Sequence, residues 1–126
     1  MSIKIIIEKT NGKSMHNVYR DEKLIGSYDQ VGYFYSGIAK VRLNNKFGFI
    51  NEKGEEITEI KYERADEFSA GYAGVSLGGK WGFINAKGEE ICKMIYDQVV
   101  WFDEGKAKVF KDGKGLLNDK NGNEFK

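Results

Sequence analysis

Few residues of this 126-residue chain have the types and spacing that catalysis or metal binding requires. His16 is the only histidine and Cys92 the only cysteine, so the sequence has no Cys/His cluster for zinc and at most one histidine for acid–base chemistry. We interpret His16 as a polar strand residue and Cys92 as a small buried or edge thiol. The sequence therefore predicts no catalytic residue, no metal site and no cofactor.

Three stretches are superficially similar to functional motifs. "LGGKWG" at 77–82 lacks the spacing of a phosphate-binding loop and is better interpreted as a hairpin turn. The pairs Glu55-Glu56 and Glu89-Glu90 repeat together with a turn, which favours solvated side chains over an acid and base. "NDKNGNE" at 118–124 lacks the distal glutamate of an EF-hand loop, so we expect a turn there as well.

The charge is balanced overall and uneven along the chain. Twenty basic and 19 acidic residues give a net charge of +1, which provides no basic stripe for nucleic acid and no field that would select a membrane surface. Residues 51–67, however, contain three basic and seven acidic side chains. These acidic residues form what we call the acidic belt: Glu52, Glu55, Glu56, Glu59, Glu63, Asp66 and Glu67.

The start of the chain, "MSIKIIIEKT", contains too short an apolar run for a signal-peptide core or a membrane span. A single cysteine also excludes the intrachain disulfide that a small secreted domain usually needs. We therefore expect a cytoplasmic protein that does not contact membranes.

The clearest feature is an ungapped internal repeat of 34 residues. "KFGFINEKGEEI" at 46–57 returns as "KWGFINAKGEEI" at 80–91. The same shift aligns tyrosines, phenylalanines, glycines, alanines and valines across three units: Tyr28, Tyr62 and Tyr96; Phe34, Phe68 and Phe102; Gly37, Gly71 and Gly105; Ala39, Ala73 and Ala107; Val41, Val75 and Val109.

Local pattern shows that the repeat is built of strands and not of the helices of a tetratricopeptide array. Ala39, Val41 and Leu43 alternate with Lys40 and Arg42, which is the period of a half-buried strand. The following "NNK", "GGK" and "DGK" tolerate the positive φ angles of hairpin turns. We predict an all-β array of antiparallel hairpins in a single domain. It contains an N-terminal cap hairpin at 1–27 and repeats at 28–61, 62–95 and 96–126, the last one degenerate.

These residues carry a resemblance. "GKWGFINAKGEEI" at 79–91, preceded by the spaced Tyr, Phe, Gly, Ala and Val, resembles the WG repeats, also called KWG repeats, of bacterial proteins. Unit one has Phe47 in place of the family's tryptophan, and neither complete unit has the proline that often follows the last strand. Unit three, "KGLLNDKNG", aligns with a lost aromatic residue before Gly115 and one extra residue before Gly122. The resemblance implies an interaction protein and not an enzyme.

The repeated phrase itself is expected to serve packing. We predict that Trp81 and Phe47 fill equivalent slots between stacked units, with Trp81 buried. Gly48 and Gly82 would let the neighbouring backbone approach closely.

Residues that the repeat does not require are the candidates for function. Tyr33, Glu67 and Trp101 occupy one repeat position next to the shared phenylalanine, and Tyr35 and Tyr72 also depart from their units. Outward aromatic residues on a rigid sheet either form protein-binding hot spots or cover an edge of the array. The predicted partner-binding residues are these five together with the belt residues Glu55, Glu56, Glu59, Glu63 and Asp66.

Two functions remain open from the sequence. The first is a non-catalytic, cytoplasmic protein-binding module, in its sharper form an immunity-type protein whose acidic belt covers a basic bacterial toxin. The alternative is recognition of a glycan or small molecule by the exposed aromatic residues, which requires a concave cluster and not a flat patch.

Overall fold

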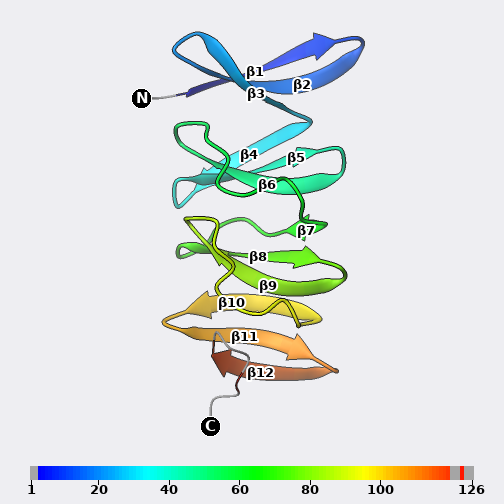
Figure 1. The fold of residues 1–126 in the computed structure, drawn as a ribbon, viewed down its shortest axis with the longest axis vertical. Helices are drawn as coiled ribbons and strands as arrows, with labels where there is room; N and C mark the ends of the chain where they lie inside the picture. The colour runs from blue at the N-terminus through cyan, green and yellow to red at the C-terminus, as the bar shows by residue number, and fades with distance from the viewer. Residues whose placement is uncertain (1–2, 120–122, 124–126) are drawn as a thin grey trace.

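The computed structural model describes residues 3–119 and residue 123. In this part of the chain, twelve β-strands form four three-stranded antiparallel sheets, stacked along the long axis with β1 at one end and β12 at the other (Figure 1). The first sheet is β1 (Ile3–Thr10), β2 (Lys13–Arg20) and β3 (Lys23–Tyr28); the second is β4 (Gln30–Tyr35), β5 (Ile38–Leu43) and β6 (Lys46–Asn51); the third is β7 (Arg64–Ala65), β8 (Tyr72–Leu77) and β9 (Lys80–Asn85); the fourth is β10 (Gln98–Asp103), β11 (Lys106–Lys111) and β12 (Lys114–Asp119).

The predicted all-β array of hairpins is confirmed, and the turns that join its central strands are those expected. Asn44 and Asn45 have φ of 53° and 65°, Gly78 and Gly79 have 64° and 78°, and Asp112 and Gly113 have 53° and 79°. Two consecutive positive φ angles define the type I′ turn, whose twist matches that of the flanking strands. In each of these three sheets, the turn therefore fixes which residues of the two flanking strands pair.

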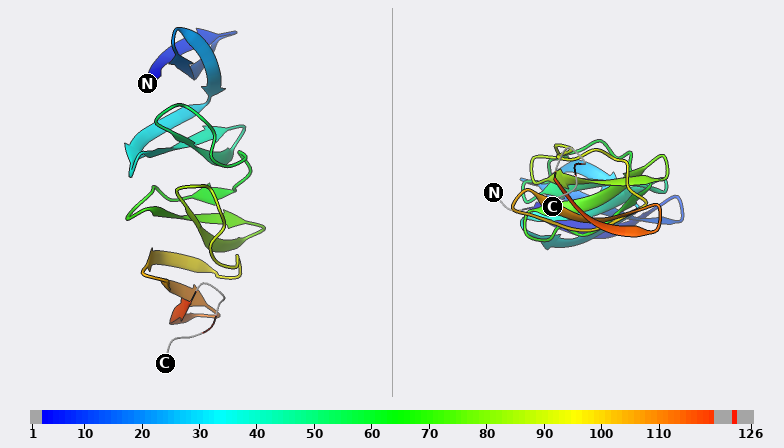
Figure 2. Two further views of the ribbon diagram at one scale, coloured as in Figure 1. Left: turned by 60° about the vertical axis from the view of Figure 1, so that its left-hand side comes forward. Right: turned by 90° about the horizontal axis from the view of Figure 1, so that it is seen from below.

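The core consists of three equivalent clusters, one between each pair of successive sheets. Figure 2 shows the stacking of these sheets from a second side. Each cluster contains a tyrosine that is almost completely buried, packed on the alanine and valine of the following sheet's middle strand. The buried members are Val18, Tyr28, Ala39, Val41 and Ile50 in the first cluster; Ile38, Phe49, Tyr62, Phe68, Ala73, Val75 and Ile84 in the second; and Phe83, Cys92, Tyr96, Val99, Phe102, Ala107 and Val109 in the third.

The tyrosines also link the sheets through their backbones. The Trp81 and Tyr96 main chains exchange two hydrogen bonds, 2.7 Å and 3.2 Å long, and Phe47 and Tyr62 do the same at 2.8 Å and 3.0 Å. Gly82 allows this pairing, since a Cβ there would lie 2.8 Å from Met94 Cγ and 3.3 Å from the Lys93 carbonyl oxygen. The predicted close approach at Gly48 and Gly82 is confirmed. Trp81 packs against the third core cluster, as predicted for a slot between units, but it is only partly buried.

The remainder of the repeated phrase forms a turn stabilised by its asparagine. Asn51 Oδ1 accepts hydrogen bonds from the backbone N–H groups of Lys53 (2.9 Å) and Glu55 (3.0 Å), and Asn85 does the same for Lys87 and Glu89 (both 3.0 Å). The glycine within the turn has positive φ and touches the preceding repeat: a Cβ on Gly88 would lie 1.9 Å from the Ile57 carbonyl oxygen. Only glycine fits on both counts.

The second glutamate of each pair has a structural role that the sequence analysis missed. The buried Tyr28 hydroxyl donates to Glu56 Oε2 at 2.7 Å, and the Tyr62 hydroxyl donates to Glu90 Oε2 at 3.0 Å. A buried hydroxyl without a partner costs about 1–3 kcal/mol, so these carboxylates satisfy the tyrosines rather than standing free in solvent. Burial, and then the neighbouring carboxylate, raise the pKa of both tyrosines.

At the N-terminal end, β1 and β2 form the expected hairpin and β3 extends it to a sheet. Tyr28, at the end of β3, pairs with His16 as Tyr62 pairs with Phe47. His16 Nδ1 accepts a hydrogen bond from the Val31 N–H at 3.1 Å, so the histidine joins the first two sheets. The cap therefore imitates the last two strands of a repeat and the crossover, our term for the segment that leads from one sheet to the next (52–63 and 86–97).

At the other end, the predicted deletion in the third repeat is wrong. Leu116 pairs with Val109 as Gly82 pairs with Val75, which is an ungapped shift of 34 residues. Glycine is needed in the second and third sheets because a crossover passes over it, whereas Leu116 stands in that position in the fourth sheet and packs on the core. Asn118 replaces Ile84, and its Nδ2 donates to the Tyr96 hydroxyl at 3.1 Å.

We predict that Gly82→Ala destabilises the protein by about 1–3 kcal/mol, because the added methyl group meets Met94 and the Lys93 backbone. Gly115→Ala in β12 is the matched control. A Cβ there approaches the tip of the flexible Lys108 side chain and the ring edge of Phe110, so little change in stability is expected. Chemical denaturation of both variants measures the difference, and equal effects would show that the crossover does not impose the glycine.

Candidate functional site

Tyr33 and Trp101 lie at β-bulges in the first strands of the second and fourth sheets. The β4–β5 register shifts between Val31 and Phe34, and the β10–β11 register shifts between Val99 and Trp101. A bulge lets two residues on one strand oppose a single partner and turns side chains outward. Tyr33 is 81% exposed and Trp101 45% exposed, whereas Phe102 beside Trp101 is buried.

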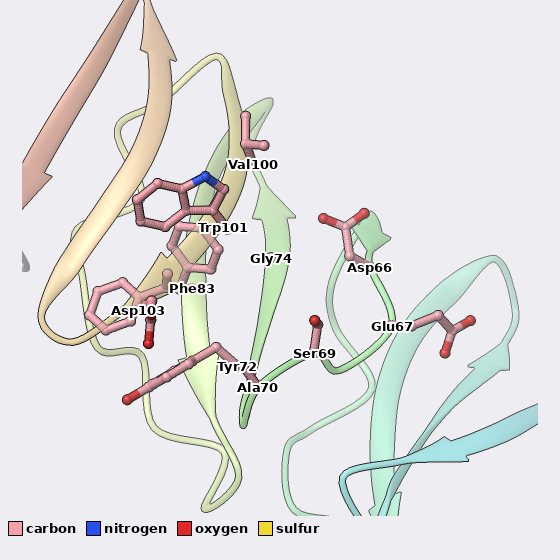
Figure 3. Close-up of a pocket in the computed structure, with 11 residues that line it drawn as sticks. Asp66, Glu67, Ser69, Ala70, Tyr72, Gly74, Phe83, Val100, Trp101 and Asp103 are labelled. Atoms are coloured by element: carbon pink, nitrogen blue, oxygen red, sulfur yellow. The ribbon is translucent and has the colours of Figure 1, made fainter.

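One of these bulges borders a cleft between the third and fourth sheets, which we call the Trp101 notch. It has a volume of about 310 Å³. Trp101 and Asp66 stand on opposite sides of it, with the strand that carries Gly74 between them and Tyr72 and Asp103 at its lower end (Figure 3). It is lined by Asp66, Glu67, Ser69, Ala70, Tyr72, Gly74, Phe83, Val100, Trp101, Phe102 and Asp103.

Gly74 breaks the repeat at this point. The equivalent residues of the other repeats are Lys40 and Lys108. A Cβ at position 74 would lie 2.6 Å from Val99 Cγ2 and 2.7 Å from Asp66 Oδ2, so a side chain there would require both neighbours to move. The missing lysine leaves the carboxylate and the indole facing an open space.

Lys40 shows what occupies the same position one sheet earlier. Its Nζ donates to the Ala65 carbonyl oxygen at 3.0 Å, lies 3.4 Å from Glu67 Oε1 and sits 5.3 Å from the Phe47 ring centroid. The chain thus places a cation between a carbonyl group, a carboxylate and an aromatic ring at one sheet boundary, and has Gly74 at the equivalent position of the next.

The notch combines an acidic side with an aromatic side. Partial burial against the strand raises the pKa of Asp66, Lys40 lowers it and Glu67 adds a smaller upward contribution. The rings of Tyr72 and Phe102 are 4.6 Å apart and those of Phe83 and Phe102 are 5.5 Å apart, so the aromatic wall is packed and rigid. Carboxylates and a ring face together suit a cationic or hydroxylated group.

The structure brings together four of the ten predicted site residues, namely Asp66, Glu67, Tyr72 and Trp101. Glu67 points away from Trp101 (Figure 3), and its Oε1 lies 3.4 Å from Lys40 Nζ. Tyr33 and Tyr35 lie on β4 of the second sheet, in the positions that Trp101 and Asp103 hold in the fourth sheet. The sequence analysis did not single out Ser69, Gly74 or Asp103, although glycine in place of the repeated lysine was a visible signal.

Several other residues of the acidic belt make hydrogen bonds within the protein. Glu56 accepts the Tyr28 hydroxyl, Glu55 accepts from Asn51 Nδ2 at 3.0 Å, and Glu63 accepts from the Gly79 N–H at 3.0 Å. Glu59 is exposed. A role of these four residues in partner binding stays a prediction.

The other residues with possible chemistry are structural or distant from the notch. Cys92 is a buried free thiol whose pKa is raised by burial, as a packing role predicts. Among the residues that the structure describes, no group of three or more His, Cys, Asp or Glu side chains could hold a metal ion. Nor does a helix long and apolar enough to cross a membrane occur in the described ranges.

A stack of β-sheets built from a 34-residue unit, with a cleft where one unit departs from the others, defines a β-repeat protein. The WG containing repeat matches residues 27–47, 47–81 and 81–114, and the chain belongs to this family. The predicted resemblance is thereby confirmed. Comparisons with curated proteins and with solved structures found no match.

The two tryptophans should differ in their effect on stability. We predict that Trp81→Ala costs about 2 kcal/mol, less than the 3–5 kcal/mol of a fully buried aromatic residue, because Trp81 is half-buried against the third core cluster. Trp101→Ala should change stability by less than about 1 kcal/mol, since its ring borders open space. Denaturant melts of both variants decide the matter. Equal losses would make Trp101 a core residue and remove it from the site.

Proposed function

We propose that the protein is a non-catalytic binding module whose Trp101 notch receives a lysine or arginine side chain of a partner protein. The observation that carries this proposal is Gly74, which deletes the lysine that Lys40 supplies one sheet earlier. A partner's cation would stand between Asp66 and the Trp101 ring. One sheet earlier Lys40 also lies between a carboxylate and a ring, those of Glu67 and Phe47, although these two occupy the repeat positions of Trp101 and Trp81. Contacts of a cation with an aromatic face are worth about 0.5–2 kcal/mol, and a facing carboxylate adds to them.

The module as a whole fits this role. The stack presents a rigid surface on which Tyr33, Tyr35 and Trp101 are exposed, and aromatic residues of this kind dominate protein interfaces. The family's repeat architecture supports a module whose units differ mainly in their surface residues. We place its action in the cytoplasm, without nucleic acid, membrane, metal or cofactor.

The sharper proposal is that the partner is a basic bacterial toxin and the protein an immunity-type inhibitor. Its support is the acidic belt, to which Asp66 and Glu67 of the notch belong. Coexpression with a toxin encoded beside it tests this version: protection of the cells that Trp101→Ala abolishes is the expected result. A locus with no toxin gene adjacent would count against it.

Tryptophan fluorescence tests the notch directly. In a Trp81→Phe background, which places in repeat two the residue that repeat one has as Phe47, Trp101 is the sole tryptophan. Short blocked peptides of glycine with one lysine or one arginine should shift its emission saturably. Peptides with norleucine or citrulline, which have similar length and no charge, should not. No saturable response to either cation would overturn the proposal.

Substitution of Asp66 should distinguish an effect on cation binding from an effect on stability. Its raised pKa means that ionisation is disfavoured in the folded state, so the carboxylate opposes folding at pH values above its pKa and stops doing so as the pH falls below it. Asp66→Asn should therefore leave stability unchanged or increase it, while weakening cation binding about tenfold. The control is Glu59→Gln, which removes the same charge from the acidic belt outside the notch.

Binding by wild-type protein should also weaken on acidification, beginning at a higher pH than an ordinary aspartate would dictate, because only the ionised carboxylate attracts the cation. Fluorescence titrations across pH measure this, with Asp66→Asn expected to lose the pH dependence. A variant that both unfolds more readily and binds normally would assign Asp66 a structural role instead.

A second candidate function is favoured by the shape of the notch. It is concave, and it combines Tyr72 and Trp101 with Asp66 and Asp103, the arrangement that recognition of a sugar requires. The same fluorescence assay with cellobiose distinguishes the two candidates. A saturable response to the sugar, with none to the lysine or arginine peptide, would replace the first proposal by this one.

A further inference from the structure

β1 is an exposed apolar edge. In the described part of the chain, β2 is the only strand that pairs with β1, and Ile5, Ile6 and Ile7 at its centre are 38%, 46% and 63% exposed. Natural edge strands are usually short, charged or interrupted by proline, because an unpaired row of N–H and C=O groups invites another strand. β1 has eight residues and an uninterrupted apolar centre.

The turn after β1 decides which backbone groups face that edge. Asn11 and Gly12 have φ of 53° and 78°, so β1 and β2 are joined by a two-residue type I′ turn. Such a turn is closed by a hydrogen-bonded pair, here Thr10 and Lys13, and hydrogen-bonded pairs recur at every second residue. The even-numbered residues of β1 therefore bond to β2. The N–H and C=O groups of Ile3, Ile5, Ile7 and Lys9 point to the free edge.

The sequence of this strand complements itself. Lys4 and Glu8 stand at equal distances on either side of Ile6, with Ile5 and Ile7 between them. We propose that β1 pairs antiparallel with β1 of a second copy of the chain, about a two-fold axis at Ile6, to form a continuous six-stranded sheet. Each Lys4 then lies opposite Glu8 of the other copy, and each Ile5 opposite Ile7.

Hydrogen-bond geometry agrees with this register. Two-fold pairing about Ile6 matches odd residues with odd residues, which are those whose backbone groups face the edge. Lys4 and Glu8 fall at non-hydrogen-bonded positions, where facing side chains approach most closely. Pairing about Ile5 or Ile7 keeps the backbone bonds but sets Lys4 or Glu8 opposite isoleucine. Charge complementarity thus selects a single register.

Glu8 is held as a carboxylate by two residues of β2. Its Oε1 accepts hydrogen bonds from the Tyr19 hydroxyl and from Asn17 Nδ2, the latter at 2.8 Å, and these bonds lower the pKa of Glu8. They draw Oε1 towards β2, so Lys4 of the second copy would reach the carboxylate from the free edge, across the face that residues 4, 6 and 8 share.

Sedimentation velocity at increasing protein concentration tests the proposal. The wild type should shift from monomer to dimer, and Lys4→Glu and Glu8→Lys should each weaken the dimer about tenfold or more, because two attractive pairs become repulsive. An equimolar mixture of the two variants should restore dimers, since one chain then has two glutamates and the other two lysines at these positions. Failure of the mixture to associate would overturn the register.

Ile7→Pro gives an independent test that does not depend on charge. It removes an N–H that faces the free edge and leaves the β1–β2 bonds in place, and edge strands tolerate proline at such positions. The variant should remain folded by circular dichroism and be monomeric. A wild type that stays monomeric at every concentration, or a dimer that persists in folded Ile7→Pro, would overturn the proposal.

Discussion

The whole architecture depends on burying one tyrosine between each pair of sheets. Tyr62 has its backbone paired with Phe47 of the second sheet, its ring in the core above Ala73 and Val75 of the third, and its hydroxyl on Glu90. One residue thus fixes the distance, the register and the order of two successive repeats. Each sheet has an apolar face that only the neighbouring sheet buries, so this link makes the units fold together.

The fold could be predicted from the sequence because the residue types that it requires recur at equivalent positions of several units. Three features together identified the hairpins and the face that points into the core. They are the alternation of apolar and polar residues, the residue pairs that tolerate positive φ angles, and the shared alanine and valine. The sequence did not show how deeply each residue is buried. Trp81 is the largest residue of the repeated phrase, yet it lies at the margin of the core, whereas Tyr96, fifteen residues later, is completely buried. Which side chain is enclosed depends on the path of the crossover to the next sheet, and local sequence patterns do not determine that path.

For the candidate site, the sequence located the bulge residues but not the cavity. Trp101, Tyr72 and Glu67 departed from the pattern of their units, Asp66 belonged to the acidic belt, and all four line the notch. The hollow itself results from an absence, the side chain missing at Gly74, and from a carboxylate folded over that glycine. For Glu56 the sequence analysis missed a contact. It predicted a solvated side chain, but Glu56 also accepts a hydrogen bond from the buried Tyr28 hydroxyl, whose position no local pattern reveals.

Departures from a repeat have different causes, and the contacts separate them. Leu116 and Asn118 depart because the fourth sheet differs in its surroundings: leucine packs where a crossover would need glycine, and asparagine takes up the Tyr96 hydroxyl. Gly74 departs in a different way. Val99 and Asp66 crowd the place that a Cβ would take, so packing accounts for the glycine itself, and the lysine of the other two repeats is lost with the side chain. The result is an open space between an exposed carboxylate and an exposed tryptophan, and this combination, more than the glycine alone, favours a ligand at the notch.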